Sequence, residues 1–102
     1  MIKSELIHNI SKQQLHLTYK DVESAVNIIL KCMINELSKG GQVEIRNFGR
    51  FSVRKRKAII GRNPRNGQSV LIKERHVVHF NTAKELKVRV NELSKEYPIK
   101  KV

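Results

Sequence analysis

The sequence predicts a small α+β fold, in which an N-terminal helical hairpin precedes a three-stranded antiparallel sheet with a long protruding β-ribbon arm and a C-terminal helix. Apolar residues recur at helical spacing up to about residue 39 and at a spacing of two after residue 41. A basic stretch between the second and third predicted strands carries the Gly, Asn and Pro residues of a hairpin tip. The 102 residues suffice for one domain, which we place at 1–94, with a mobile tail at 95–102.

Two helices are expected in the first part of the chain. The first covers about Lys3–Gln14 and has apolar residues three and four apart at its centre. The second covers about Tyr19–Lys39, with Thr18 as its N-cap and Asp21 three residues later in a variant of the capping box. The glycine pair that follows ends this helix.

The second predicted helix has a wide apolar surface. Its stripe runs from Val22 to Leu37 and is broader than one short neighbouring helix can cover. A chain this small also buries only about 60–65% of its unfolded surface, so dimerisation is a natural way to complete the core. The single cysteine, Cys32, lies within the stripe and is expected to be buried there, without an internal disulfide.

A change to a period of two marks the strands. The first strand has apolar residues at Val43 and Ile45, and the second has them at Phe51 and Val53. The turn between them is Asn47-Phe48-Gly49. The alternation with polar residues predicts a sheet that is buried on one face only.

The third strand leads into the last helix. We expect this strand at about His76–Phe80 and the helix at about Ala83–Ser94. Thr82 and Glu85 form a capping box for the helix, and Pro98 stops it.

The charge of the chain points to a polyanionic partner. Lys and Arg number 21 against 9 Asp and Glu, which gives a formal net charge of +12. The alternative is a basic surface with no binding role. No apolar run is long enough to span a membrane, and the N-terminus has no signal-peptide pattern. A cytoplasmic location without a membrane partner is therefore expected.

The segment Arg54–Arg75 is the most basic part of the chain, with eight Lys or Arg residues and one acidic residue, Glu74. Strand-like runs at Lys57–Ile60 and Ser69–Ile72 flank a turn at Gly61–Gly67. Because a two-stranded ribbon is only marginally stable alone, it should project as a flexible arm, thin enough to follow a DNA groove. The predicted DNA-binding residues of the arm are Arg54, Lys55, Arg56, Lys57, Arg62, Asn63, Arg65, Lys73 and Arg75.

Pro64 stands at the tip of this ribbon among cations. A proline in a hairpin turn is ordinary and by itself indicates only a turn. At the end of a basic ribbon, however, a rigid apolar wedge is suited to parting two stacked base pairs from the minor groove. Arg62 and Asn63 are placed to hold the minor-groove floor and phosphates beside it.

At these residues the chain resembles a known family. Gly61-Arg62-Asn63-Pro64, preceded by Asn47-Phe48-Gly49-Arg50-Phe51 and followed by Gly67, resembles the HU and integration host factor family of bacterial nucleoid proteins that bend DNA. The resemblance covers about Met1 to Asn91. Within the family the chain is most similar to the β-type subunit of integration host factor, through Lys3-Ser4-Glu5-Leu6-Ile7, Gln13-Gln14, Val43-Glu44-Ile45-Arg46, His79-Phe80 and Lys84-Glu85-Leu86.

The resemblance implies an intertwined dimer whose two arms reach around double-stranded DNA, with a proline kink at each tip. The dimer is either a homodimer or a heterodimer with an α-type subunit. The resemblance further implies a nucleoid location and roles in nucleoid organisation, transcription, recombination or replication. Lys3 and Lys84 are the expected phosphate contacts of the body.

Sequence preference is implied at two residues of the first strand. In the β-type subunit an Arg matching Arg46 reaches the minor groove, and a Glu matching Glu44 helps to position it. The two residues are expected on one face of one strand. The alternative is that Glu44 only forms a cross-strand salt bridge on a solvated face.

Three positions depart from the family pattern. Asn47 stands where the family usually has Gly, although Asn tolerates a left-handed turn. Gln42 replaces a basic residue often seen in the β-type subunit, which weakens the readout argument. Ile59 replaces an arm Arg or similar residue, which removes one expected contact.

Other function classes have less support. A helix-turn-helix reader needs Arg, Asn or Gln grouped on one helix, and both predicted helices carry mixed charge instead. An RNA-binding module is allowed by charge, but three Phe and two Tyr offer little for a stacking platform. The four histidines have no metal-ligand spacing with Cys32, and His76 and His79 should face opposite sides, so no enzyme, cofactor or metal is expected. An HU-like homodimer with little sequence preference remains the alternative to an integration-host-factor-like protein.

Overall fold

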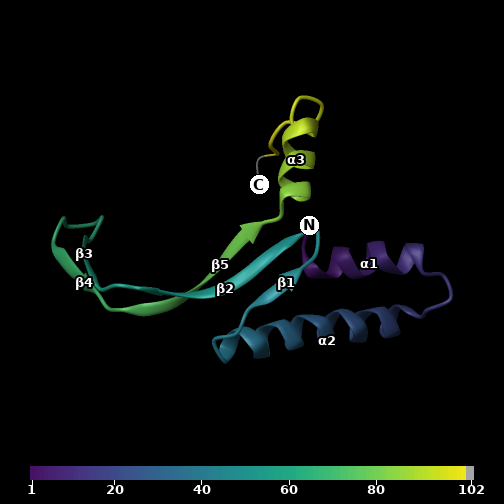
Figure 1. Ribbon diagram of the computed structural model, residues 1–102, viewed down its shortest axis with the longest axis horizontal. Coiled ribbons are helices and arrows are strands. Elements are labelled where there is room, and N and C mark those ends of the chain that lie inside the picture. Colours follow the sequence, from purple (N-terminus) through teal and green to yellow (C-terminus); the bar gives the residue numbers. More distant parts are fainter. Residues whose placement is uncertain (101–102) are drawn as a thin grey trace.

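Two antiparallel helices form the N-terminal part of the computed structural model, which describes residues 1–100 (Figure 1). α1 spans Lys3–Gln13 and α2 spans Tyr19–Ser38. The N-cap prediction is confirmed, because the Thr18 hydroxyl accepts a hydrogen bond of 3.1 Å from the Asp21 backbone N–H. The helices therefore begin and end within one or two residues of the expected positions.

The end of α2 is closed by the two glycines. Gly40 has a φ of 82° and its N–H donates to the Leu37 carbonyl at 3.0 Å. The Gly41 N–H donates to the Glu36 carbonyl at 3.0 Å, which completes a Schellman motif. The left-handed conformation explains why glycine stands at position 40.

The core of the single chain is small. Within residues 1–100 its buried apolar members are Ile7, Val22 and Val26. On α2, by contrast, Ile29 and Ile34 of the apolar stripe remain 58% and 61% exposed. Because α1 contacts only one side of α2, part of the wide apolar stripe is left uncovered, as its width predicts.

Cys32 lies on this uncovered surface and is exposed. The prediction that it is buried is therefore wrong for the single chain. Its position in the stripe was identified correctly, but α1 does not reach it.

Three strands form an antiparallel sheet in the order β1-β2-β5. β1 spans Val43–Ile45, β2 spans Gly49–Arg56 and β5 spans Arg75–Thr82. Asn47, in the turn between β1 and β2, has a φ of 68°, so asparagine does adopt the left-handed conformation expected of it. β2 and β5 are longer than predicted and carry the sheet to the base of the arm.

Gly49 is required by a cluster of aromatic side chains. A Cβ at this buried position would lie 2.5 Å from the Phe80 ring. The Phe80 ring packs on Phe51 and Phe48, with centroid distances of 4.6 and 5.4 Å. The Asn-Phe-Gly turn therefore fastens the start of β2 to the end of β5.

The arm projects away from the body (Figure 1). β3, Ile59–Arg62, and β4, Ser69–Ile72, form a separate two-stranded antiparallel sheet. The radius of gyration is 18.8 Å, whereas a compact chain of this length has about 13 Å. The turn prediction began too early, because Gly61 and Arg62 pair with Val70 and Ser69 and belong to the ribbon.

The last helix begins without the predicted capping box. α3 spans Lys84–Leu93 and its N-cap is Ala83, which has no side-chain cap. Thr82 is one residue too early for this role because it is still paired with Gly49 in the sheet. The helix ends at Leu93, within one residue of the predicted end. A turn follows before Pro98, in which the Tyr97 N–H donates to the Leu93 carbonyl at 2.9 Å. Residues 101–102 of the predicted mobile tail lie outside the described residues, and the mobility of 95–100 stays a prediction.

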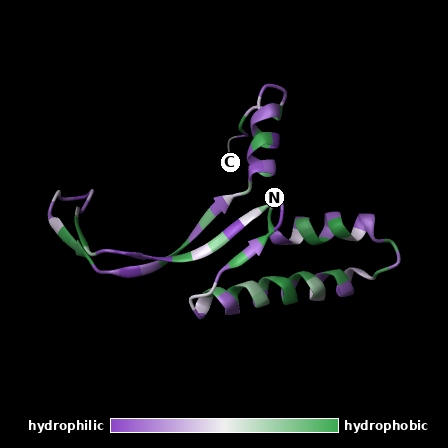
Figure 2. Ribbon diagram, viewed as in Figure 1, coloured by the Kyte–Doolittle hydropathy of each residue, from purple (hydrophilic) through white to green (hydrophobic). Residues whose placement is uncertain are grey.

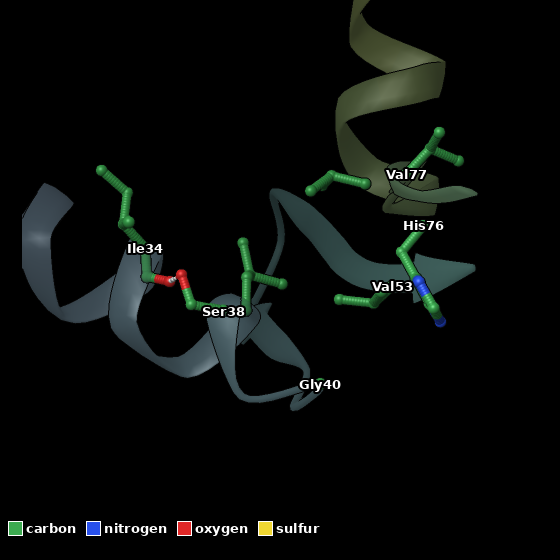
Figure 3. Close-up of a pocket in the computed structure, with 8 residues that line it drawn as sticks. Ile34, Ser38, Gly40, Val53, His76 and Val77 are labelled. Atoms are coloured by element: carbon green, nitrogen blue, oxygen red, sulfur yellow. Dashed lines mark hydrogen bonds between the residues drawn. The ribbon is translucent and has the colours of Figure 1, made fainter. Parts of the chain in front are cut away.

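An apolar hollow of about 570 Å³ opens between the end of α2 and the sheet (Figure 3). Its lining includes Ile34 and Leu37 of α2, Val53 of β2 and Val78 of β5. The Ser38 hydroxyl on its rim donates to the Ile34 carbonyl at 2.7 Å, so this polar group is satisfied within the helix. The hollow continues the uncovered apolar surface of α2.

Candidate nucleic-acid interface

The central sheet has one apolar face and one basic face. Phe51 pairs with Phe80, and Val53 pairs with Val78, so these apolar side chains share a face. The opposite face, which we call the basic face, carries the alternate residues of β2 and β5. These are Arg50, Ser52, Arg54, Arg56, Arg75, Val77, His79 and Asn81. As predicted, His76 and His79 lie on opposite faces.

The predicted arm cations divide between the two faces at the base of the arm. Arg54, Arg56 and Arg75 lie on the basic face and are exposed. Lys55 lies on the other face, and its ammonium is 3.0 Å from the carboxylate of Glu74. Arg56 and Arg75 are direct cross-strand neighbours. Because like charges directly opposite each other on two strands repel, an anion between them would be stabilising.

The remaining arm cations lie further out. Lys57 and Lys73 stand in the connections between the central sheet and the ribbon, whereas Arg62 and Arg65 lie at or next to the tip. All four are exposed. The arm therefore presents positive charge at its base and at its end, on a support too thin to bury any of it.

The tip is folded by asparagine side chains. The Asn63 side-chain oxygen accepts a hydrogen bond of 2.9 Å from the Arg65 N–H, and that of Asn66 accepts one of 3.0 Å from the Gln68 N–H. Gly67 adopts a φ of 69°. These bonds hold Pro64 at the exposed end of the arm. The sequence placed Asn63 in the hairpin tip, and the hydrogen bond from the Arg65 N–H is the contact by which it shapes the turn. The contact of Asn63 with DNA stays a prediction.

The two candidate readout residues are arranged differently from the prediction. Glu44 lies in β1, but Arg46 lies one residue past the end of the strand, in the turn. The Glu44 carboxylate instead bonds the Arg50 guanidinium, its direct cross-strand neighbour, at 3.3 Å. The alternative of a cross-strand salt bridge is therefore what the geometry shows for Glu44. Arg50 was missed as its partner, since only the strand register reveals it.

Arg46 nevertheless stays near this pair. Glu44, Arg46 and Arg50 line one shallow hollow of about 280 Å³, together with Asn81. Arg46 is exposed there. The hollow thus brings two guanidinium groups and one carboxylate to the edge of the basic face.

The two body lysines stand at helix starts. Lys3 is the first residue of α1 and Lys84 is the first residue of α3, and both side chains are exposed. Backbone N–H groups at a helix N-terminus favour an anion, so a phosphate at either place would meet both an ammonium and free amides. Within residues 1–100 no cluster of His, Cys, Asp or Glu is arranged to hold a metal ion. No helix in the same range is long and apolar enough to cross a membrane.

Sequence comparison decides the family of this chain. The bacterial DNA-binding protein family matches residues 1–91, which include both helices of the hairpin, the arm and most of α3. The chain belongs to this family. It is an architectural DNA-binding protein of the HU and integration host factor group, a group of DNA-binding proteins and not of enzymes.

The relatives favour the integration host factor branch. The integration host factor subunit beta of Tolumonas auensis is 48% identical over 93 residues, covering 91% of this chain and 100% of the relative. The corresponding subunit of Halorhodospira halophila is 45% identical over 100 residues, covering 98% of each chain. The predicted similarity to the β-type subunit is confirmed.

Solved structures of HU share the fold. Anabaena HU, crystallised with DNA, has a TM-score of 0.77 at 28% identity and covers 97% of this chain and 100% of its own. HU from Thermotoga maritima has a TM-score of 0.62 at 29% identity and covers 88% and 98%. The α+β class and the order of elements are therefore confirmed.

Proposed function

We propose that this chain is one subunit of a dimer that bends duplex DNA, with two arms following the minor groove and Pro64 wedged between base pairs at each tip. The observation that carries the proposal is the arm itself. It holds an exposed proline at the end of a ribbon whose base and tip are cationic. Parting a base step requires a few kcal/mol, which is offset when the bent duplex wraps more of the protein.

The dimer follows from the uncovered apolar surface of α2. Ile29 and Ile34 are both more than half exposed, and Ile34 also lines the open apolar hollow. A second chain of the same fold, identical or α-type, would cover this surface and bring two arms to one side of the body. Anabaena HU, which has the same fold, was crystallised with DNA, and this supports DNA as the partner proposed for this chain.

The dimer also prefers certain DNA sites in this proposal, through Arg46. Arg46 is exposed beside the Glu44–Arg50 pair, where it is free to enter a minor groove. That groove distinguishes mainly A·T from G·C pairs, so preference must also use DNA shape. In this proposal the dimer is nucleoid-associated and cytoplasmic, and its bends serve DNA compaction, transcription, recombination or replication.

A binding selection on random duplexes tests this function. The purified chain is selected alone and with a candidate α-type subunit, and the enriched duplexes are then measured for bending. Enrichment of a motif that Arg46→Gln abolishes supports the site-preferring proposal. Bending without any motif supports the HU-like alternative. Equal binding to single-stranded RNA and no bending of duplex DNA would contradict both.

A further inference from the structure

The outer part of the arm is apolar, which phosphate binding does not explain. Figure 2 shows a hydrophobic stretch there, between the hydrophilic base of the ribbon and its tip. The cross-strand pairs in this stretch are Ile59–Ile72, Ile60–Leu71 and Gly61–Val70. These side chains are remote from the core and carry no charge, so they need another role.

The two faces of the ribbon are not equivalent. On one face Ile72 lies over Gly61, because a Cβ at Gly61 would be only 3.1 Å from the Ile72 Cδ1. Ile72 is consequently 36% exposed. On the other face Ile60 and Leu71 are 76% and 66% exposed, and nothing of this kind covers them. We call this second face, which also carries Arg62 and Ser69, the open face.

The charges around the open face indicate which kind of binding partner can cover it. Lys57 and Lys73 lie at one end of the apolar stretch, and Arg62 and Arg65 lie at the other. A second arm of the same chain would bring the same cations into contact and be repelled, whereas a polyanion would be attracted. The occupant must therefore combine phosphates with an apolar surface between them.

The minor groove of DNA has this combination. Its walls are deoxyribose rings, whose carbon-bound hydrogens can pack on Ile and Leu, and phosphates line both edges. In RNA the 2′-hydroxyl stands in the minor groove. Packing an aliphatic side chain on that hydroxyl would remove its water without replacing the hydrogen bond, which is unfavourable.

We propose that Ile60 and Leu71 pack on the deoxyribose walls of the minor groove and make the arm discriminate against ribose. This inference rests on the proposed placement of the arms in that groove. Arg62, two residues from Ile60 on the same face, binds a neighbouring phosphate and sets the depth of the ribbon. The arm thus selects DNA by its sugar, in addition to attracting it by charge.

The test compares two duplexes of one sequence, one of DNA throughout and one with a short run of ribonucleotides in the tract that the arms contact. The wild-type dimer should bind the all-DNA duplex more tightly. In Ile60→Thr/Leu71→Thr the ratio of the two affinities should fall about tenfold, because each change removes about one buried methylene or more. Val70→Thr is the matched control, since it makes the same kind of change on the other face and should keep the wild-type ratio.

An unchanged ratio in the double variant would overturn the inference. If that variant also no longer self-associates in sedimentation without DNA, the apolar pair contacts a second arm instead of the sugar. Bending of the all-DNA duplex by the wild-type dimer is measured in parallel. If the duplex bends but the ratio is unchanged, the sugar contact alone is wrong; if it does not bend, the proposed function itself is wrong.

Discussion

Glu44 and Arg50 face each other across β1 and β2, with the carboxylate oxygen 3.3 Å from the guanidinium nitrogen. Both side chains are more than half exposed, at 67% and 51%. Water screens such a pair, so it orders the edge of the basic face more than it stabilises the fold. The main consequence of the ion pair is that Glu44 orients Arg50, while Arg46 stays free to contact DNA.

Glu44→Gln should therefore change the free energy of unfolding by less than about 1 kcal/mol. Because the substitution releases the Arg50 guanidinium, affinity for duplex DNA should rise slightly at low salt. Urea denaturation and fluorescence anisotropy check the two parts. A large loss of stability would mean that the carboxylate supports the turn in a way that the exposed pair does not suggest. Arg50→Gln is the companion variant and should lower affinity instead.

Local features of the sequence predicted the fold well. Thr18 caps α2 because an N-cap needs only the residues of the next turn. The same pattern failed at Thr82, since that residue is still paired with Gly49 in the sheet. Strand pairing is a long-range property, and it overrode the local signal.

At the candidate DNA-binding site, too, local features were predictable from the sequence and features that depend on strand pairing were not. The proline tip and the cations of the arm are evident from composition alone, but their distribution over two faces depends on the strand register. Lys55 was grouped with Arg54 and Arg56, yet it lies on the other face and pairs with Glu74. Cys32 was expected to be buried, but the surface around it is covered by no part of the described chain.

The salt dependence of binding should report how many arm cations meet phosphates. Replacing both Arg54 and Arg56 with Gln should reduce the slope of log affinity against log salt by about two, because two counterion-releasing contacts are lost. Lys55→Gln is the control from the same strand. Its effect should be smaller, since Lys55 lies on the other face and is already paired with Glu74. Anisotropy titrations over a series of salt concentrations measure the slopes, and equal effects of all three cations would contradict the two-face description.

The exposed surface of α2 should be the dimer contact. Ile34 is 61% exposed in the single chain and lines the apolar hollow. Ile34→Glu places a charge where the partner would bury it, so the dimer should dissociate at micromolar concentration. Ile99→Glu makes the same change at a site that is 98% exposed in the tail and should leave the dimer intact. Sedimentation velocity separates the species, and a wild-type chain that is a stable folded monomer would contradict this use of the surface.

Pro64 should control bending more than affinity. Pro64→Ala keeps every cation of the arm and the side-chain bonds of the Asn63 turn, but it replaces a rigid ring with a single methyl group. The smaller side chain cannot hold a base step open, so the duplex should bend less. Affinity should fall by less than about tenfold, because phosphate contacts supply most of it.

Energy transfer between dyes at the two ends of one duplex measures the bend in this experiment. Pro98→Ala is the matched control, since it removes the other proline of the chain from the tail beyond α3, far from the arm tip. It should leave both the bend and the affinity unchanged. Equal bend angles for the wild-type chain and Pro64→Ala would rule out the wedge. The ribbon would then bend DNA only by neutralising phosphates along one side of the duplex, and replacing Arg54 and Arg56 with Gln would reduce the bend angle more than Pro64→Ala does.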